Sequence, residues 1–196
     1  MHRLIRVLEA TDPELAEHGM RTAQLARDVA VQMKLASDVV DRIEAAASLH
    51  DIGKLFINRD ILDKPGPPTE REWVELRRHP RLGFELLRGR VADSVARIVL
   101  CHHERCDGLG YPSRIAGGDV PVEARVLQVA DAFDAITSIR PYQPALPVSF
   151  AVAELKRCSG SQFDPRAVRG IIELIEKSGW ELAGADLESL DDEVAV

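Results

Sequence analysis

The chain has 196 residues, of which 45% are hydrophobic and 29% are charged, so one domain with a packed core is expected and general disorder is not. Its net charge of −7 argues against a partner that is a nucleic-acid polymer, although bound metal ions could still provide positive charge for a small anionic ligand. The sequence has no run of about 18 apolar residues and no secretory signal, and its three cysteines are scattered. We therefore expect no membrane association, no disulfide framework and a reduced protein in the cytoplasm.

Helical patterns cover almost the whole chain, and no segment shows convincing period-two alternation, so the predicted fold class is all-α. Asp12 is a predicted helix cap with Pro13 at the first helical position. Ser37 or Asp38 is expected to open the next helix, which runs through apolar positions and ends near Gly53.

The middle and C-terminal parts alternate between loops and helices. Residues 58–68 contain three prolines and a glycine and are predicted to form a loop. Thr69 and Glu72 have the spacing of a capping box at the start of another helix. A long loop rich in glycine and proline is predicted over residues 105–121, and such a loop in a compact domain is often functional. Further helices are predicted near 80–88, 92–104, 122–138, 147–158 and 165–178.

Three parts are expected along the chain. Residues 1–11 form a lead-in helix, and residues 12–178 form a single compact helical domain. Residues 179–196 form an acidic tail that is expected to be mobile.

Histidine and aspartate residues stand at unusual positions in apolar segments. His50 and Asp51 are adjacent near the end of an apolar helix, His102 and His103 are adjacent within a predicted helix, and Asp131 lies in an apolar run. Taken singly, each has an ordinary explanation as a surface or hydrogen-bonded residue. Taken together, buried groups of this kind need partners, and metal ions would satisfy several at once. A mixed set without thiolate favours iron, manganese, zinc or nickel in a catalytic site.

A series of motifs resembles the HD-GYP subgroup of the HD phosphohydrolase superfamily. The matching strings run in order over nearly the whole chain, and the longest, HHExxDGxGYP, is specific. They are HGMR at 18–21, LHDIGK at 49–54, ILDKPG at 61–66, HP at 79–80, HHERCDGLGYP at 102–112, VPVEAR at 120–125, VADAFDAITS at 129–138, RPY at 140–142 and FDP at 163–165.

The resemblance implies a metal centre with two or three divalent ions, for which iron or manganese is expected. The implied ligands are His18, His50, Asp51, His79, His102, His103 and Asp131. By the same resemblance, Asp51 bridges two of the ions. Glu14 stands one helical turn before His18, where some members bind a third ion. Its alternative role is that of an acidic residue favoured in the first turn of a helix.

The resemblance also implies an activity, namely hydrolysis of cyclic di-GMP to linear pGpG and then GMP. In such a site two metals about 3.5–4 Å apart activate a bridging water and stabilise the charge at phosphorus. Asp51 and Lys54 are the implied catalytic residues, with a solvent-exposed lysine as the alternative for Lys54. Arg140, Tyr111 and Gly110 are the implied substrate-binding residues, although Tyr111 could instead only pack its loop. Arg21 either contacts phosphate or pairs with a carboxylate. The 105–121 loop is also implied in contacts with diguanylate cyclase (GGDEF) proteins.

Three positions depart from the family pattern. Gln143 replaces a common lysine or arginine, Ile139 replaces a frequent aspartate, and Cys101 replaces a common histidine and is expected to be a small core residue. No implied metal ligand is missing. Two alternatives stay open: a non-catalytic module that senses a cyclic dinucleotide or docks a GGDEF partner, and a phosphohydrolase for another cyclic dinucleotide.

Overall fold

The fold is a bundle of helices without strands in the part of the chain that the structure describes, as the sequence predicted. The structure is a computed structural model that describes residues 1–138 and 145–178. The only bridge pairing among these residues is an isolated one, between Ser159 and Phe163. The helices are α1 His2–Thr11, α2 Pro13–Gln32, α3 Ser37–Ala47, the 3₁₀ helix η1 Ile52–Phe56, α4 Arg59–Leu62, α5 Glu70–Leu76, α6 His79–Leu87, α7 Asp93–Cys101, η2 Gly117–Asp119, α8 Val122–Thr137, α9 Val148–Arg157 and α10 Pro165–Ser178.

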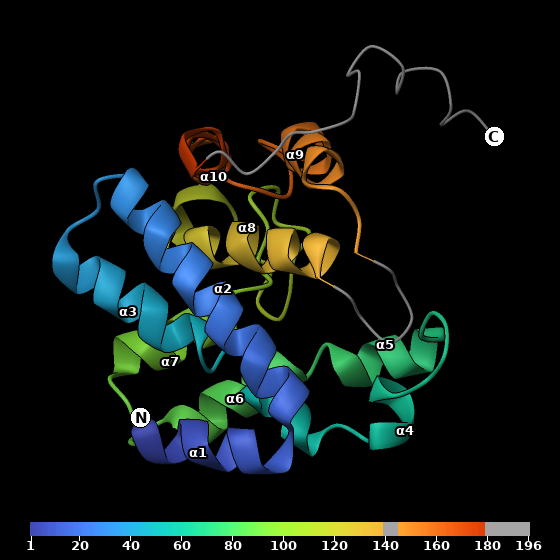
Figure 1. The fold of residues 1–196 in the computed structure, drawn as a ribbon. Coiled ribbons are helices and arrows are strands. Elements are labelled where there is room, and N and C mark those ends of the chain that lie inside the picture. Colours follow the sequence, from blue (N-terminus) through green and yellow to red (C-terminus); the bar gives the residue numbers. More distant parts are fainter. Residues whose placement is uncertain (139–144, 179–196) are drawn as a thin grey trace.

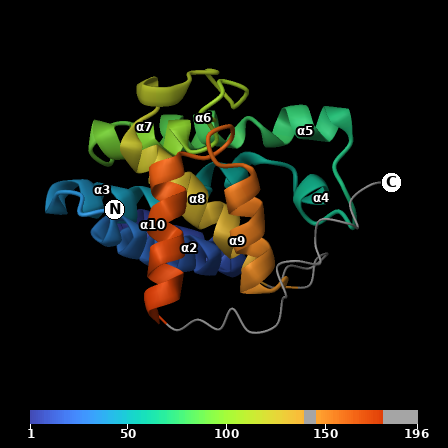
Figure 2. The ribbon, with the colours of Figure 1, turned by 90° about the horizontal axis from the view of Figure 1, so that it is seen from above.

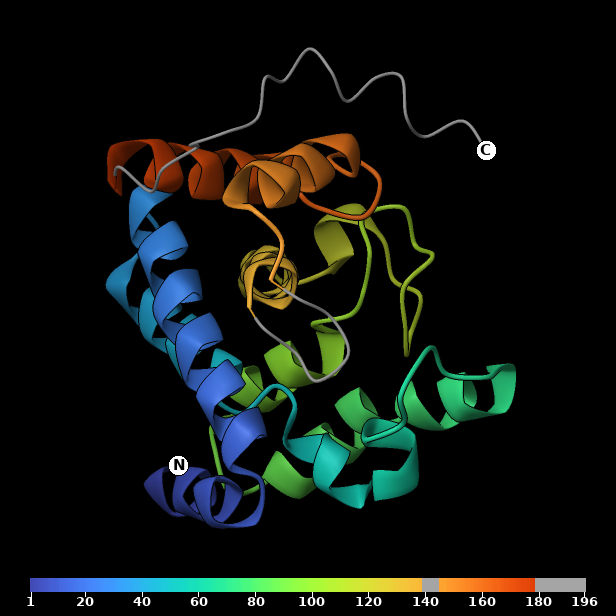
Figure 3. The same cartoon turned by 45° about the vertical axis from the view of Figure 1, so that its right-hand side comes forward.

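Helix α8 lies at the centre of the bundle. Figure 3 looks nearly along its axis, with α2 on one side, α9 and α10 on another and the 105–121 loop on a third. Val126, Leu127, Val129 and Ala130 are all fully buried, as expected of a helix that is covered from several sides. Helix α2 crosses the molecule between α3 and α8 and packs on both (Figure 1).

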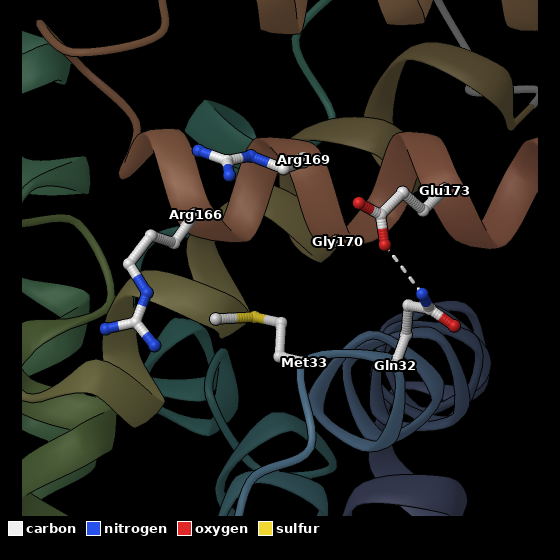
Figure 4. Close-up of a pocket in the computed structure, with 6 residues that line it drawn as sticks. All are labelled: Gln32, Met33, Arg166, Arg169, Gly170 and Glu173. Atoms are coloured by element: carbon white, nitrogen blue, oxygen red, sulfur yellow. Dashed lines mark hydrogen bonds between the residues drawn. The ribbon is translucent and has the colours of Figure 1, made fainter.

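Helices α9 and α10 lie side by side over α8 and α2 when the molecule is seen from above (Figure 2). Where α10 crosses the end of α2, a β-carbon on Gly170 would lie 2.8 Å from Met33 Cγ, so glycine allows the two helices to approach. Gln32 Nε2 donates a 2.7 Å hydrogen bond to Glu173 across this seam, at the edge of a pocket (Figure 4).

Two predicted helix starts are confirmed. Asp12 caps α2, because its carboxylate accepts a 3.1 Å hydrogen bond from the Leu15 amide, and Pro13 is the first helical residue. At α5, Thr69 and Glu72 form both hydrogen bonds of the capping box. Each cap satisfies amide groups that a helix leaves unpaired at its start.

The predicted start of the next helix is also confirmed, because α3 begins at Ser37, although the residue before it is Ala36 and no side chain caps it. Its predicted end near Gly53 was wrong. The helix ends at Ala47, and the chain then tightens through hydrogen bonds between residues three apart and enters η1. The predicted 58–68 loop contains the short helix α4, where the Asn58 side-chain oxygen accepts a hydrogen bond from the Asp60 amide.

The predicted 92–104 helix also ends earlier, at Cys101, so His102 and His103 follow the helix instead of lying within it. The 105–121 loop is present, with η2 as a short 3₁₀ turn inside it. Its backbone is fixed by amides of Cys106 and Asp107, which donate to the segment between α9 and α10. Among the described residues, no helix is both long and apolar enough to cross a membrane. The predicted acidic tail, 179–196, lies outside the described residues.

Candidate metal centre

Five histidines and two aspartates meet beside the N-terminal half of α2. They come from α2, the turn after α3, the start of α6, the turn after α7, and α8, and most are buried. We call this set the centre. It consists of His18, His50, Asp51, His79, His102, His103 and Asp131.

Three histidines of the centre are oriented by the same kind of hydrogen bond to the backbone. In each of them Nδ1 lies close to the backbone carbonyl oxygen three residues earlier, at 2.7 Å for His50, 2.7 Å for His79 and 2.6 Å for His102. A carbonyl oxygen can only accept, so Nδ1 must carry the proton. When the ring is neutral, its Nε2 lone pair is then free for a metal ion. His50 and His102 lie in the turns that follow α3 and α7, and their rings reach carbonyl groups in the last turns of those helices.

Asp51 joins two groups of donors through its two oxygen atoms. Its Oδ2 lies 3.4 Å from His50 Nε2 and its Oδ1 lies 3.2 Å from His79 Nε2. Asp51 is therefore a member of both groups of possible metal ligands. The groups with metal-ligand spacing are His18, His50 and Asp51 on one side, and Asp51, His79, His102 and His103 on the other.

Asp131 extends the first group. Its Oδ1 lies 3.1 Å from His18 Nε2 and 3.7 Å from His50 Nε2. In the second group, Nε2 of His79 and Nε2 of His102 are only 3.3 Å apart. Two neutral rings with protons on Nδ1 would direct lone pairs at each other across this distance, which a shared positive charge would relieve.

Two atoms of the centre are buried without a hydrogen-bond partner among the described residues: His50 Nε2 and Asp51 Oδ1. A buried polar atom left unpaired costs roughly 1–3 kcal/mol. Both atoms are ordinary metal ligands, and the set supplies nitrogen and oxygen donors without sulfur. The residues present therefore fit divalent cations.

The electrostatics of the protein without ions show the same need for positive charge. Burial lowers the pKa of His50, but Asp51 and Asp131 outweigh it and raise that pKa to about 10. Burial raises the pKa of Asp51, but Lys54 and His50 hold it well below its usual value. For His103, burial and a neighbouring imidazole lower the pKa to about 3, so this ring stays neutral. Bound cations would replace the protons that the two carboxylates otherwise attract.

A supporting carboxylate, Asp134, was missed in the sequence. Its Oδ2 accepts a 2.7 Å hydrogen bond from Nδ1 of His18, which leaves Nε2 of that ring directed at the centre. Arg21 donates two hydrogen bonds to Asp134, from Nε at 2.9 Å and from Nη2 at 3.1 Å. The Ser138 hydroxyl group donates a third. Arg21 therefore pairs with a carboxylate. The signal in the sequence was the spacing, because Asp134 follows Asp131 by three residues on one helix face.

Lys54 lies against the centre, with Nζ donating to Asp51 Oδ2 at 2.6 Å, and its side chain is partly exposed. The turn between them fits tightly onto α6. A β-carbon on Gly53 would lie 2.0 Å from the carbonyl oxygen of His79 and 2.6 Å from the amide nitrogen of Gly83. Glycine at 53 therefore lets Asp51 and His79 approach each other.

Tyr111 lies at the edge of the centre. Its ring stacks on His103, with centroids 4.8 Å apart and an interplanar angle of 30°, and its amide donates to the His103 carbonyl at 3.2 Å. Gly110 is buried, and a β-carbon there would lie 2.5 Å from the Arg105 amide nitrogen and from the His103 carbonyl oxygen. The close packing of the loop thus explains glycine at 110, while Tyr111 contacts a ring of the centre directly.

Not every predicted site residue is brought to the centre. Glu14 is exposed and belongs to neither group of donors. Arg140, Ile139 and Gln143 lie outside the described residues. Cys101 is buried in the core, where desolvation raises the pKa of its thiol to about 11.

Comparison with known proteins gives consistent matches. Residues 3–167 match the family model described as HD domain. Over 175 residues the chain is 43% identical to the cyclic di-GMP phosphodiesterase response regulator RpfG of Xanthomonas campestris pv. campestris (strain 8004), covering 88% of this chain and 46% of the relative. It is 34% identical over 176 residues to the 3'3'-cGAMP-specific phosphodiesterase 2 of Vibrio cholerae serotype O1, covering 88% of this chain and 34% of the relative. The chain therefore spans less than half the length of these two relatives. The solved structure of Bd1817, an HDG"Y"P protein from Bdellovibrio bacteriovorus, has the same fold, with a TM-score of 0.68 and 18% identity over 83% of this chain and 52% of that chain.

Proposed function

This chain belongs to the HD domain family, as its motifs predicted, and we propose that it is a metal-dependent phosphodiesterase that hydrolyses cyclic di-GMP. The proposed product is linear pGpG, with GMP formed by a second cleavage. The observation that carries the proposal is the convergence of the centre, with two buried donor atoms that have no hydrogen-bond partner among the described residues.

The centre provides enough donors for two ions that share Asp51. The proposed ligands of one ion are His18, His50, Asp51 and Asp131, and those of the other are Asp51, His79, His102 and His103. Iron or manganese fits this mixture of imidazole and carboxylate. Glu14 is proposed as a ligand of a third ion only through its place one turn before His18. Diffraction at metal absorption edges would test it, and a free Glu14 carboxylate would refute the third ion.

The chain's own residues have separate tasks in this proposal. When bound, the cations would supply a water of lowered pKa and offset the negative charge at phosphorus. Hydrogen bonds to backbone carbonyls hold His50, His79 and His102 in position before any ligand arrives, so little reorganisation is needed. Lys54 keeps its ammonium group beside Asp51, where it can contact a substrate phosphate and where it keeps Asp51 in the charged form that a cation needs. The partial exposure of His18, Asp131 and Lys54 gives the substrate a way in.

The test is chromatography of cyclic di-GMP after anaerobic incubation with protein of known metal content, with ferrous or manganous ion added. We expect pGpG to appear, and to be absent with protein stripped of metal. A metal-loaded sample that binds the nucleotide and never cleaves it would favour a sensor over an enzyme. The same assay with 3'3'-cGAMP addresses the second candidate substrate, which the resemblance to a cGAMP-specific relative supports.

A protein contact through the 105–121 loop is also proposed, with a diguanylate cyclase (GGDEF) protein as the partner. Its support is Leu109, an apolar side chain that is 75% exposed on a loop whose backbone is otherwise fixed. Leu109→Ser should weaken co-purification with such a partner and leave hydrolysis unchanged.

A further inference from the structure

A guanidinium group lies between two aromatic rings beside the centre. Arg77 is the residue that ends α5, and its Cζ lies 5.5 Å from the ring centroid of Trp73 and 5.8 Å from that of Tyr111. Tyr111 in turn stacks on His103. We call Trp73, Arg77 and Tyr111 the rim, because they lead outward from the centre to solvent.

Arg77 has different partners from two other exposed arginines, Arg78 and Arg59. Arg78 pairs with Glu75, and Arg59 pairs with Asp12. Within residues 1–138 and 145–178, the Arg77 side chain has ring contacts but no ion pair and no hydrogen bond. The residue is also exposed. The chain as a whole is acidic, with 32 acidic and 25 basic residues, and yet this cation has no acidic partner among the described residues. Its donors are therefore available to a ligand.

The two rings restrict how those donors can point. A guanidinium group is attracted to an aromatic face, and its N–H groups lie in one plane as a rigid fork. Guanine presents two neighbouring acceptors, N7 and O6, that match such a fork. Adenine presents N7 beside an amino group, which is a donor and cannot accept the second hydrogen bond. Trp73, which is 40% exposed, offers a further face on which a base can stack.

We propose that Arg77 is the specificity residue that distinguishes guanine from adenine in the substrate. Its position supports this, since it lies two residues before His79 and next to the ring that packs on His103. In this proposal, a nucleotide whose phosphate lies at the centre meets the rim with its base. The inference rests on the proposed function for its substrate class, but it concerns base recognition and not the hydrolytic step.

Binding of mononucleotides tests the inference independently of turnover. The chain has two tryptophans, so Trp180→Phe leaves Trp73 as the single fluorescent tryptophan. In this background, with metal bound, 5′-GMP should quench the fluorescence at a concentration at least about tenfold lower than 5′-AMP requires. This is the difference expected for one bidentate base contact. Arg77→Gln should remove most of this preference by weakening GMP binding. Arg77→Lys should remove it too, because an ammonium group keeps the charge but not the fork.

Arg78→Gln is the matched control, because Arg78 is the next residue in the sequence but pairs with Glu75. This variant should keep the preference for GMP. Equal binding of both nucleotides by the parent, no binding of either, or a preference that survives in Arg77→Gln or Arg77→Lys would overturn the inference. Circular dichroism checks that each variant is folded.

Hydrolysis assays on the same proteins separate the two proposals. If Arg77→Gln lowers kcat/KM for cyclic di-GMP about tenfold to a hundredfold, the inference and the proposed function both hold. If GMP is preferred but no cyclic dinucleotide is cleaved, the proposed function fails and base recognition stands. If cyclic di-GMP is cleaved equally well by Arg77→Gln and the parent, the inference fails and the proposed function stands.

Discussion

The centre and the rim lie next to each other, but their side chains are held in different ways. In the centre, backbone carbonyls and Asp134 fix the imidazole rings from behind, and the side facing the cluster keeps unpaired atoms. In the rim, Arg77 contacts two ring faces, has no ion pair or hydrogen bond among the described residues, and is exposed. The difference fits the two proposed roles, which are binding of cations at the centre and selection among similar organic ligands at the rim.

Removal of the shared carboxylate should have the largest effect. Asp51→Ala deletes the group that joins both sets of donors, so we expect metal content to fall and hydrolysis to drop by at least about a thousandfold. Metal analysis and product chromatography measure both quantities, and circular dichroism should show the helices retained. Asp60→Ala, an exposed change on α4, is the control. Normal turnover by Asp51→Ala would refute the centre.

A change at a residue that is not itself a proposed ligand should disturb the centre nearly as much. In Gly53→Ala the new methyl group would lie 2.0 Å from the His79 carbonyl oxygen, so the turn that carries Asp51 must move away from α6. We expect the free energy of unfolding to fall by about 3 kcal/mol in urea titrations, with loss of activity. Gly118→Ala is the matched control, because a β-carbon there meets no atom within 4 Å. Equal stability of the two variants would show that the close fit is unimportant.

The support behind His18 should have an intermediate effect. Asp134→Asn keeps the shape but weakens the charged hydrogen bond to His18 and the pairing with Arg21. We expect metal affinity and activity to fall about tenfold to a hundredfold, as for other groups that orient a ligand. Competition with a chelator measures the affinity, with Asp119→Asn, on the surface, as the control. An unchanged affinity would mean that His18 is held by other contacts.

Asp134 should also make stability depend on pH in the metal-free protein. Burial alone would raise the pKa of this carboxyl group, but His18 and Arg21 lower it from 3.8 to about 2. The unfolded chain therefore binds more protons between these values, so the stabilisation is present above about pH 4 and is lost as the pH falls towards 2. We expect a loss of about 1–2 kcal/mol in that range relative to Asp134→Asn. Parallel pH profiles for the two proteins would contradict this assignment.

The smallest expected effect lies in the rim. Tyr111→Phe keeps the ring that stacks on His103 and should change kcat/KM for cyclic di-GMP by less than about twofold. Tyr111→Ala removes the ring contact and should lower it about tenfold at most. If kcat/KM falls as much in the phenylalanine variant as in the alanine variant, the hydroxyl group and not the ring makes the contact that matters for hydrolysis.

Local sequence determined the all-α class and the caps at Asp12 and Thr69, because periodicity and capping act over a few neighbouring positions. The residues proposed for the metal centre came from motifs that resemble those of the HD-GYP family. Local sequence could not give the early ends of α3 and α7, which go together with contacts of imidazole rings to carbonyl groups and to neighbouring histidines across the bundle. Only the tertiary structure decided that Asp134 supports His18, 116 residues away, and that Arg77 lies between Trp73 and Tyr111. Contacts between distant segments form through the packing of whole helices, and no spacing along the chain encodes the distance between two side chains from different helices.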